Sequence, residues 1–226
     1  LCCFAIPNYL FAQLSALHSY KRAGNVIVLD ETADTLLYAF AGGMNSSQFM
    51  NIDLDLDGTF DLLVFDRHGN RLLPFLIKPG KEFEYSFAPG LADELPKTEQ
   101  WIQTHDYNQD GRMDIFTYTT GGIKVFRNDS QGSLKFTQVS KPFLLSQQGA
   151  TLTNILVTSV DYPAITDIDA DGDLDVLCFW GLGSFIEWHR NTSIERFGTT
   201  DSLTFEKASS CWGHFAEGNE DNTIKL

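Results

Sequence analysis

The chain has 226 residues, of which 43% are apolar and 13% aromatic, and its formal net charge is −14 at pH 7. This apolar content can fill a hydrophobic core, which excludes an intrinsically disordered chain. The negative charge argues against a nucleic-acid backbone or an anionic membrane surface as partner, because both would repel it. Gly, Asn and Asp recur between short apolar runs, so we expect an all-β fold.

The first twelve residues, 1–12, form an apolar run that is too short to span a bilayer and that precedes a polar stretch. They resemble the end of a signal peptide, so we expect export to the cell surface or medium without membrane insertion. A buried first strand is the alternative. The apolar runs 26–29 and 36–40 predict two extra strands ahead of the repeats described next. Residues 214–226 are expected to begin a continuation of the chain.

Three copies of one unit make up most of the sequence, and the first aspartates of their acidic windows are 53 and 61 residues apart, near the size of one propeller blade. In each unit an apolar strand leads into an acidic window, and three further strands follow, the last of them short and aromatic. The units cover residues 48–96, 101–145 and 162–213.

A four-stranded antiparallel sheet cannot bury both of its faces alone, so such units must pack on their neighbours. Radial packing is the usual solution, and we predict a partial β-propeller of about three complete four-stranded blades plus the extra N-terminal strands. Residues 141–161 are an insertion before the third unit, with a possible strand at 155–157.

Each acidic window has the pattern D-x-[DN]-x-D-G-x-x-D. Calcium takes six to eight oxygen ligands at about 2.3–2.6 Å, and side chains at positions 1, 3 and 5 of a tight loop can point at one centre. Glycine at position 6 allows the turn that brings the position-7 carbonyl to the ion, and the last aspartate completes the shell. We predict about three Ca²⁺ ions. Their predicted ligands are Asp53, Asp55, Asp57, Thr59 and Asp61, then Asp106, Asn108, Asp110, Arg112 and Asp114, and then Asp167, Asp169, Asp171, Asp173 and Asp175.

Two other structures could carry such windows, an EF-hand and an acidic hairpin turn without a metal. An EF-hand needs an acidic ligand at position 12, where this chain has Val64, Thr117 and Cys178, so it is excluded. Acidic hairpin turns without a metal remain the alternative, because Asp and Gly are common in turns.

The units resemble the FG-GAP, or VCBS-type, repeats of integrin α-subunit propellers and of many bacterial secreted proteins. The resemblance spans about residues 45–213 and rests on the three windows, on the strand starts that follow them, and on residues 125–128 and 188–191, which are similar to the aromatic-x-Arg-Asn segment of the repeat. The first unit departs from it at residues 75–78, so we expect a different turn there. The resemblance implies structural calcium and a protein or glycan partner bound elsewhere on the propeller.

The sequence gives no sign of a catalytic centre. It has no G-x-S-x-G motif, and glycosidase-type carboxylates cannot be told apart from the calcium ligands. Its five histidines lack ligand spacing, no Cys/His zinc spacing occurs, and Cys178 lies in an apolar run typical of a buried strand, while Cys211 could form a disulfide.

We therefore expect a calcium-binding adhesion or binding scaffold that is not an enzyme. A lectin or carbohydrate-active enzyme completed by other sequence is the alternative, because Trp180, Trp188 and Trp212 could form a sugar-binding surface. Packing of these three residues between blades would explain them equally well.

Overall fold

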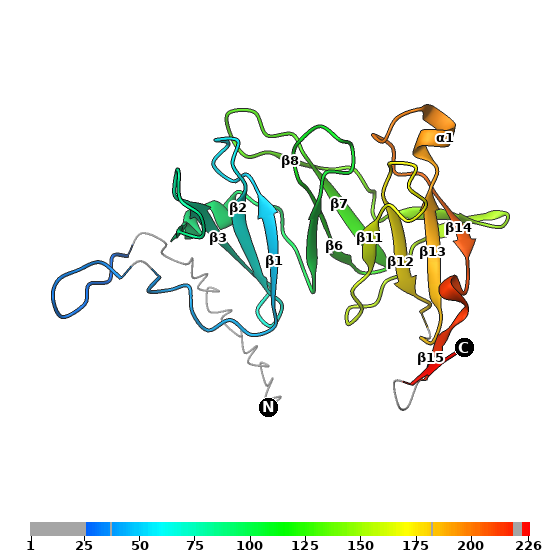
Figure 1. The fold of residues 1–226 in the computed structure, drawn as a ribbon, viewed down its shortest axis with the longest axis horizontal. Helices are drawn as coiled ribbons and strands as arrows, with labels where there is room; N and C mark the ends of the chain where they lie inside the picture. Colours follow the sequence, from blue (N-terminus) through cyan, green and yellow to red (C-terminus); the bar gives the residue numbers. More distant parts are fainter. Residues whose placement is uncertain (1–25, 37, 182, 219–222) are drawn as a thin grey trace, which may run out of the picture.

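The computed structural model describes residues 26–36, 38–181, 183–218 and 223–226, and it is all-β apart from a few short helical turns. Three larger sheets follow one another along the long axis of the molecule (Figure 1). None of these sheets closes on itself within the described residues. The signal segment expected at residues 1–12 lies outside them.

The first two units each form a four-stranded antiparallel sheet with strands in sequential order, as predicted. The short fourth strand of the first sheet begins at Tyr85, two residues after Phe83, which has a φ of +61° and an 83% exposed side chain. The first sheet consists of β1 (Ser47–Ile52), β2 (Asp61–Asp66), β3 (Arg71–Ile77) and β4 (Tyr85–Phe87), and the second of β5 (Ile102–His105), β6 (Asp114–Thr119), β7 (Gly122–Asn128) and β8 (Phe136–Gln138).

The third sheet has six strands instead of four, in the order β10-β9-β14-β13-β12-β11. The additional pair is a hairpin from the insertion, and its first strand runs parallel to β14, with Ser146 opposite Phe205. The strands are β9 (Leu145–Gln148), β10 (Thr151–Asn154), β11 (Ala164–Thr166), β12 (Asp175–Phe179), β13 (Ile186–Asn191) and β14 (Phe205–Ser209).

The strand proposed at residues 155–157 was wrong, because the hairpin ends at Asn154. Ile155 and Val157 are instead fully buried in the apolar core, at 0% and 1% exposure. Their apolar character therefore reflects core packing and not strand pairing.

Short elements complete the fold. The helix α1 (Ser193–Phe197) follows β13, the 3₁₀ helices are Pro89–Asp93 and Trp212–His214, and β15 (Ala216–Glu217) pairs with β16 (Ile224–Lys225). Among the described residues, no helix combines the length and the apolar character needed to cross a bilayer.

The two extra N-terminal strands were also a wrong prediction for the described residues. Only one isolated bridge, between Leu29 and Thr35, joins this region to itself. The Asp30 carboxylate accepts hydrogen bonds from the N–H groups of Thr32 and Asp34, at 2.8 and 2.9 Å, and so favours a tight turn over an extended strand. The segment then covers the outer face of the first sheet, where the Tyr38 ring lies 6.3 Å from the ring of Phe75.

Apolar side chains join the three sheets face to face. The cluster between the first and second sheets includes Ile52, Leu63, Phe65, Ile102 and Ile115. The cluster between the second and third sheets includes Trp101, Phe116, Val125, Ile165, Val176 and Phe205. This is the packing between neighbouring units that the sequence predicts, and it fixes the sheets relative to one another.

Replacing Phe116 with alanine should destabilise the protein by about 3–5 kcal/mol, because it removes a fully buried ring between two sheets. The matched control is Phe49→Ala on β1, whose side chain is 69% exposed and whose loss should cost less than about 0.5 kcal/mol. Urea denaturation of both variants gives the comparison. Equal losses would contradict the assignment of the core.

Candidate metal sites in the acidic loops

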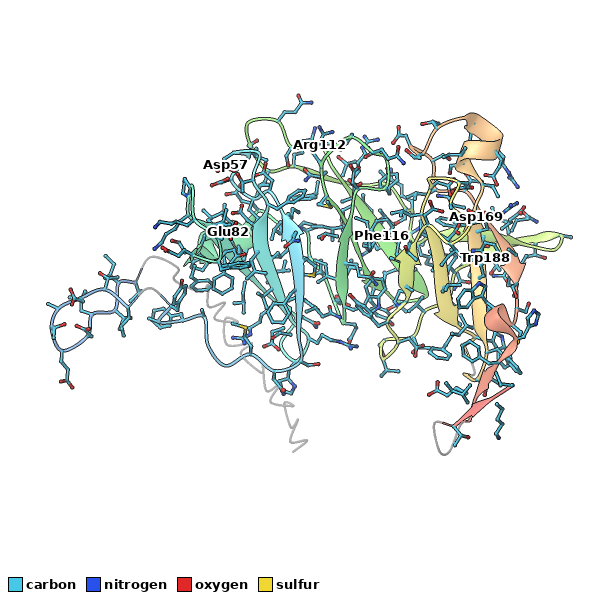
Figure 2. The ribbon with its side chains drawn as sticks, in the orientation of Figure 1. Asp57, Glu82, Arg112, Phe116, Asp169 and Trp188 are labelled. Atoms are coloured by element: carbon cyan, nitrogen blue, oxygen red, sulfur yellow. The ribbon has the colours of Figure 1, made fainter. Side chains whose placement is uncertain are left out.

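The three acidic windows form the loops that connect β1 to β2, β5 to β6 and β11 to β12. All three loops lie at the same end of the sheets, as Asp57, Arg112 and Asp169 show in Figure 2. The face-to-face packing of the sheets therefore places the charge-rich windows along one edge of the molecule.

The loops share one backbone conformation. Positions 4 and 6 of each window have positive φ, so the chain reverses twice and its odd-numbered side chains converge. The sequence predicted the special role of glycine at position 6, whereas position 4 is occupied by ordinary residues and was missed. The φ angles are 63°, 58° and 62° at Leu56, Gln109 and Ala170, and 88°, 86° and 101° at Gly58, Gly111 and Gly172.

Side chains at positions 1, 3 and 5 converge as a cation site requires. In the first and third loops, carboxylate oxygens of the residues at these positions lie within 4.8 Å of one another. One buried oxygen of the first aspartate, Oδ1, has no hydrogen-bond partner in either loop. Such crowded and unpartnered carboxylates fit a calcium ion. The first loop brings together Asp53, Asp55 and Asp57, and the third Asp167, Asp169 and Asp171.

Backbone N–H groups hold the predicted ligands in place in the same way in all three loops. The position-6 N–H donates to the position-1 carboxylate, and the position-7 N–H donates to the position-5 carboxylate. The first type joins Gly58 to Asp53, Gly111 to Asp106 and Gly172 to Asp167 at 2.9, 2.8 and 3.1 Å, and the second joins Thr59 to Asp57, Arg112 to Asp110 and Asp173 to Asp171 at 2.7, 2.9 and 3.0 Å.

The last aspartate of each window is buried and braces the loop. Asp61 accepts hydrogen bonds from the N–H of Leu54 in the loop and from that of Ile77 on β3, both at 2.8 Å. The equivalent donors are Tyr107 and Asn128 for Asp114, and Ile168 and Asn191 for Asp175. This residue therefore ties the loop to the third strand of its sheet, a role beyond the ligand role that the sequence predicted.

Burial raises the pKa of the last aspartate of each window. Loss of solvation raises the pKa of Asp114 to about 7 and that of Asp175 to about 6, and it also raises the pKa of Asp61. Neighbouring loop carboxylates, such as Asp106 and Asp110 beside Asp114, add to the effect. A bound divalent cation would act in the opposite direction, because it favours the ionised carboxylate.

The asparagine of the aromatic-x-Arg-Asn segment has a structural reason. Asn128 Nδ2 donates to the carbonyl of Met113 at 3.1 Å, and Asn128 Oδ1 accepts from the N–H of Ser130 at 3.1 Å. Asn191 repeats the first contact with the carbonyl of Leu174 at 3.3 Å. In the first unit Ile77 takes the place of the asparagine and keeps only the backbone bond to Asp61.

Trp188 also supports the third loop, because its Nε1 donates to Asp175 Oδ2 at 3.1 Å. The side chain of Trp188, on β13, is half-buried, and so is that of Trp212 in the second 3₁₀ helix. Of the three tryptophans considered for a sugar-binding surface, only Trp180 is well exposed, at 44%.

The second loop differs from the other two in its charge. The Arg112 guanidinium forms an ion pair with Asp110 and donates from Nε to the carbonyl of Asn128 at 2.8 Å, and Asn108 Nδ2 also donates to Asp110, at 3.0 Å. The sequence assigned only the backbone carbonyl of Arg112 to this site. Its side chain supplies positive charge beside a predicted calcium ligand.

The third loop holds a second group of carboxylates, in which Asp171 and Asp173 were predicted ligands and Glu195 was not. Asp173 is fully buried, its Oδ2 accepts from the N–H of Ile194 at 3.1 Å, and its Oδ1 has no partner. Its carboxylate lies within 4.8 Å of those of Asp171 and Glu195. Sequence reasoning missed Glu195 because it lies on α1, beyond the third strand, and only the fold returns it to the loop.

The pH dependence of the stability of the calcium-free protein tests the role of the buried Asp114. The unfolded chain ionises Asp114 near its ordinary pKa of 3.8, whereas the folded chain retains the proton until about pH 7. The contribution of the protonated Asp114 carboxyl to the stability of the fold is therefore complete below about pH 4 and is lost as the pH rises to about 7. Thermal melts in EDTA should show wild type losing stability relative to Asp114→Asn across this range. A constant difference between the two proteins would contradict the assignment.

Comparison with protein families agrees with this arrangement. Residues 106–178 match the model of the FG-GAP-like repeat, a segment that begins at the first residue of the second acidic loop and extends through the third loop into β12. A search of curated proteins found no match. The chain therefore contains an FG-GAP-like repeat over residues 106–178.

Proposed function

We propose that this chain is a calcium-stabilised, extracellular binding scaffold of the β-propeller type. The observation that carries the proposal is the convergence of carboxylates with buried, unpartnered oxygens in the first and third loops. The second loop, which has the same backbone path, completes a set of about three Ca²⁺ sites.

The chemistry of the loops favours calcium among common cations. All predicted ligands are oxygens, and the loops are built from turns that can adapt to an irregular shell, whereas Mg²⁺ demands near-ideal octahedral geometry and retains several waters. Extracellular calcium modules bind at about 10⁻⁴–10⁻³ M, which suits export to a medium with millimolar calcium. Bound cations would also relieve the formal net charge of −14.

The architecture and the FG-GAP-like repeat support the binding role. Sheets that pack face to face in series suit a propeller, and the calcium loops occupy only one end of the sheets. We propose that the ions brace the blades and that a protein or glycan partner binds elsewhere on the surface. This role is non-enzymatic.

A carbohydrate-binding role is the second candidate, and one pocket favours it. The cavity of about 330 Å³ is lined by the β9–β10 hairpin and by residues of β13 and β14, and we call it the hairpin pocket. Its walls combine the exposed Trp180 with Asn154, Glu187 and Lys207, a mixture of aromatic and polar groups that suits a sugar. A glycan-binding screen with product analysis separates the candidates: no bound glycan favours a protein partner, and turnover would contradict the non-enzymatic role.

Removing Asp55 and Asp57 together should abolish the first calcium site. Calorimetry should then count about two ions instead of about three, and the rise of several degrees in melting temperature on adding millimolar Ca²⁺ should shrink. Mg²⁺ should not reproduce the rise in wild type.

The control removes two exposed acidic residues that lie outside the loops, Glu31 and Glu82. Glu31→Ala/Glu82→Ala lowers the negative charge by the same amount and should leave the ion count unchanged. If Asp55→Ala/Asp57→Ala lost as much stability in EDTA as in calcium, a metal role for these side chains would be wrong.

The charge of Arg112 should weaken calcium binding in the second loop. Arg112→Gln removes the positive charge beside Asp110 and should raise the affinity of one site severalfold. Arg127→Gln serves as the control, because Arg127 pairs with Asp129 and Asp201, which are not loop ligands. Calorimetric titration measures both variants. An unchanged affinity in Arg112→Gln would show that the ion pair does not compete with calcium.

A further inference from the structure

A second cluster of metal-ligating side chains lies in the third sheet, apart from the acidic loops. Ligand atoms of Cys178, Glu187 and His189 are all within 4.8 Å of one another. Cys178 on β12 is paired directly with Glu187 on β13, and His189 follows two residues later on the same face. The three residues are buried, with exposures of 4%, 9% and 0%.

One ring nitrogen of His189 has no hydrogen-bond partner in this cluster. Its Nδ1 lies 2.9 Å from the hydroxyl of Ser146 on β9, whereas its buried Nε2 has no hydrogen-bond partner and lies 3.5 Å from Glu187 Oε2. If Nδ1–H donates to Ser146, the lone pair of Nε2 faces a carboxylate oxygen. Two such electron-rich atoms at this separation favour a cation between them.

The neighbours of the cluster hold its ligands in place. Lys207 Nζ lies 2.9 Å from Glu187 Oε1, which leaves Oε2 facing the imidazole. Ser146 fixes the orientation of the His189 ring in the same way. Outer hydrogen bonds to a ligating carboxylate and to the second nitrogen of a ligating histidine are typical of protein metal sites.

We propose that Cys178, Glu187 and His189 bind one Zn²⁺-type transition-metal ion, independently of the calcium loops. A thiolate, an imidazole and a carboxylate form a ligand set that Zn²⁺ accepts and calcium does not prefer. Three protein ligands leave a fourth position for water. Glu187 also lines the hairpin pocket, which supplies a route for the ion.

Metal binding must displace one proton from the cysteine. Burial raises the pKa of the Cys178 thiol to about 12, so the metal-free protein carries a neutral thiol. As the metal–sulfur bond forms, the S–H bond breaks and its proton passes to the buffer.

Cobalt substitution tests the proposal on the full chain, with Cys2 and Cys3 changed to serine to remove their thiols. After treatment with EDTA and transfer to millimolar Ca²⁺, which occupies the loops, Co²⁺ is titrated. One equivalent should produce a near-ultraviolet thiolate-to-cobalt band together with visible bands of tetrahedral cobalt, and Zn²⁺ should abolish both. Absence of the thiolate band would overturn the proposal.

Variants assign the band to the cluster. Cys178→Ser should abolish it, Ser146→Ala should weaken metal affinity by about tenfold through loss of the outer hydrogen bond, and the control Cys211→Ser should change nothing. A band that persists in a folded Cys178→Ser would overturn the proposal. If Cys178→Ser does not fold, His189→Gln decides in its place, since an unchanged affinity would also overturn it. The calcium-induced rise in melting temperature is measured separately, so failure here leaves the calcium proposal intact.

Discussion

The structure depends on a buried carboxylate that is repeated once in each unit. Asp61, Asp114 and Asp175 each accept one hydrogen bond from the acidic loop and one from the third strand of the same sheet. Removal from water raises the pKa of all three carboxyl groups despite these donors, and Asp175 has a further donor in Trp188 Nε1. A cation bound in each loop, as proposed above, would favour the ionised form of these carboxylates.

Packing between the sheets brings the three acidic loops to one end of the molecule. Because apolar clusters fix the three sheets face to face, their loops emerge at one end and concentrate negative charge there. The second and third loops also touch, since Gln109 Nε2 donates to the carbonyl of Gly172 at 2.7 Å. The second and third loops therefore brace each other as well as their own sheets.

The inserted hairpin gives the third sheet a chemistry that the other two sheets lack. By pairing with β14 it brings Ser146 against His189 and forms one wall of the hairpin pocket. Oxygen ligands in turns characterise the loop end, whereas sulfur, nitrogen and oxygen ligands on paired strands characterise the buried cluster. The two places suit different classes of metal ion for that reason.

By itself, the sequence determined the features that depend on local spacing: the all-β class, the strands of the three units, the acidic windows and the glycine at position 6. These features follow from patterns of two to nine residues, because such patterns determine the local conformation of the chain. Only the tertiary structure decided which of these segments meet. It placed Glu195 beside Asp171, paired Cys178 with Glu187, and put the insertion on the edge of the third sheet. It also left the N-terminal apolar runs without strand pairing in the described residues, because a strand needs a partner edge that no local pattern can supply.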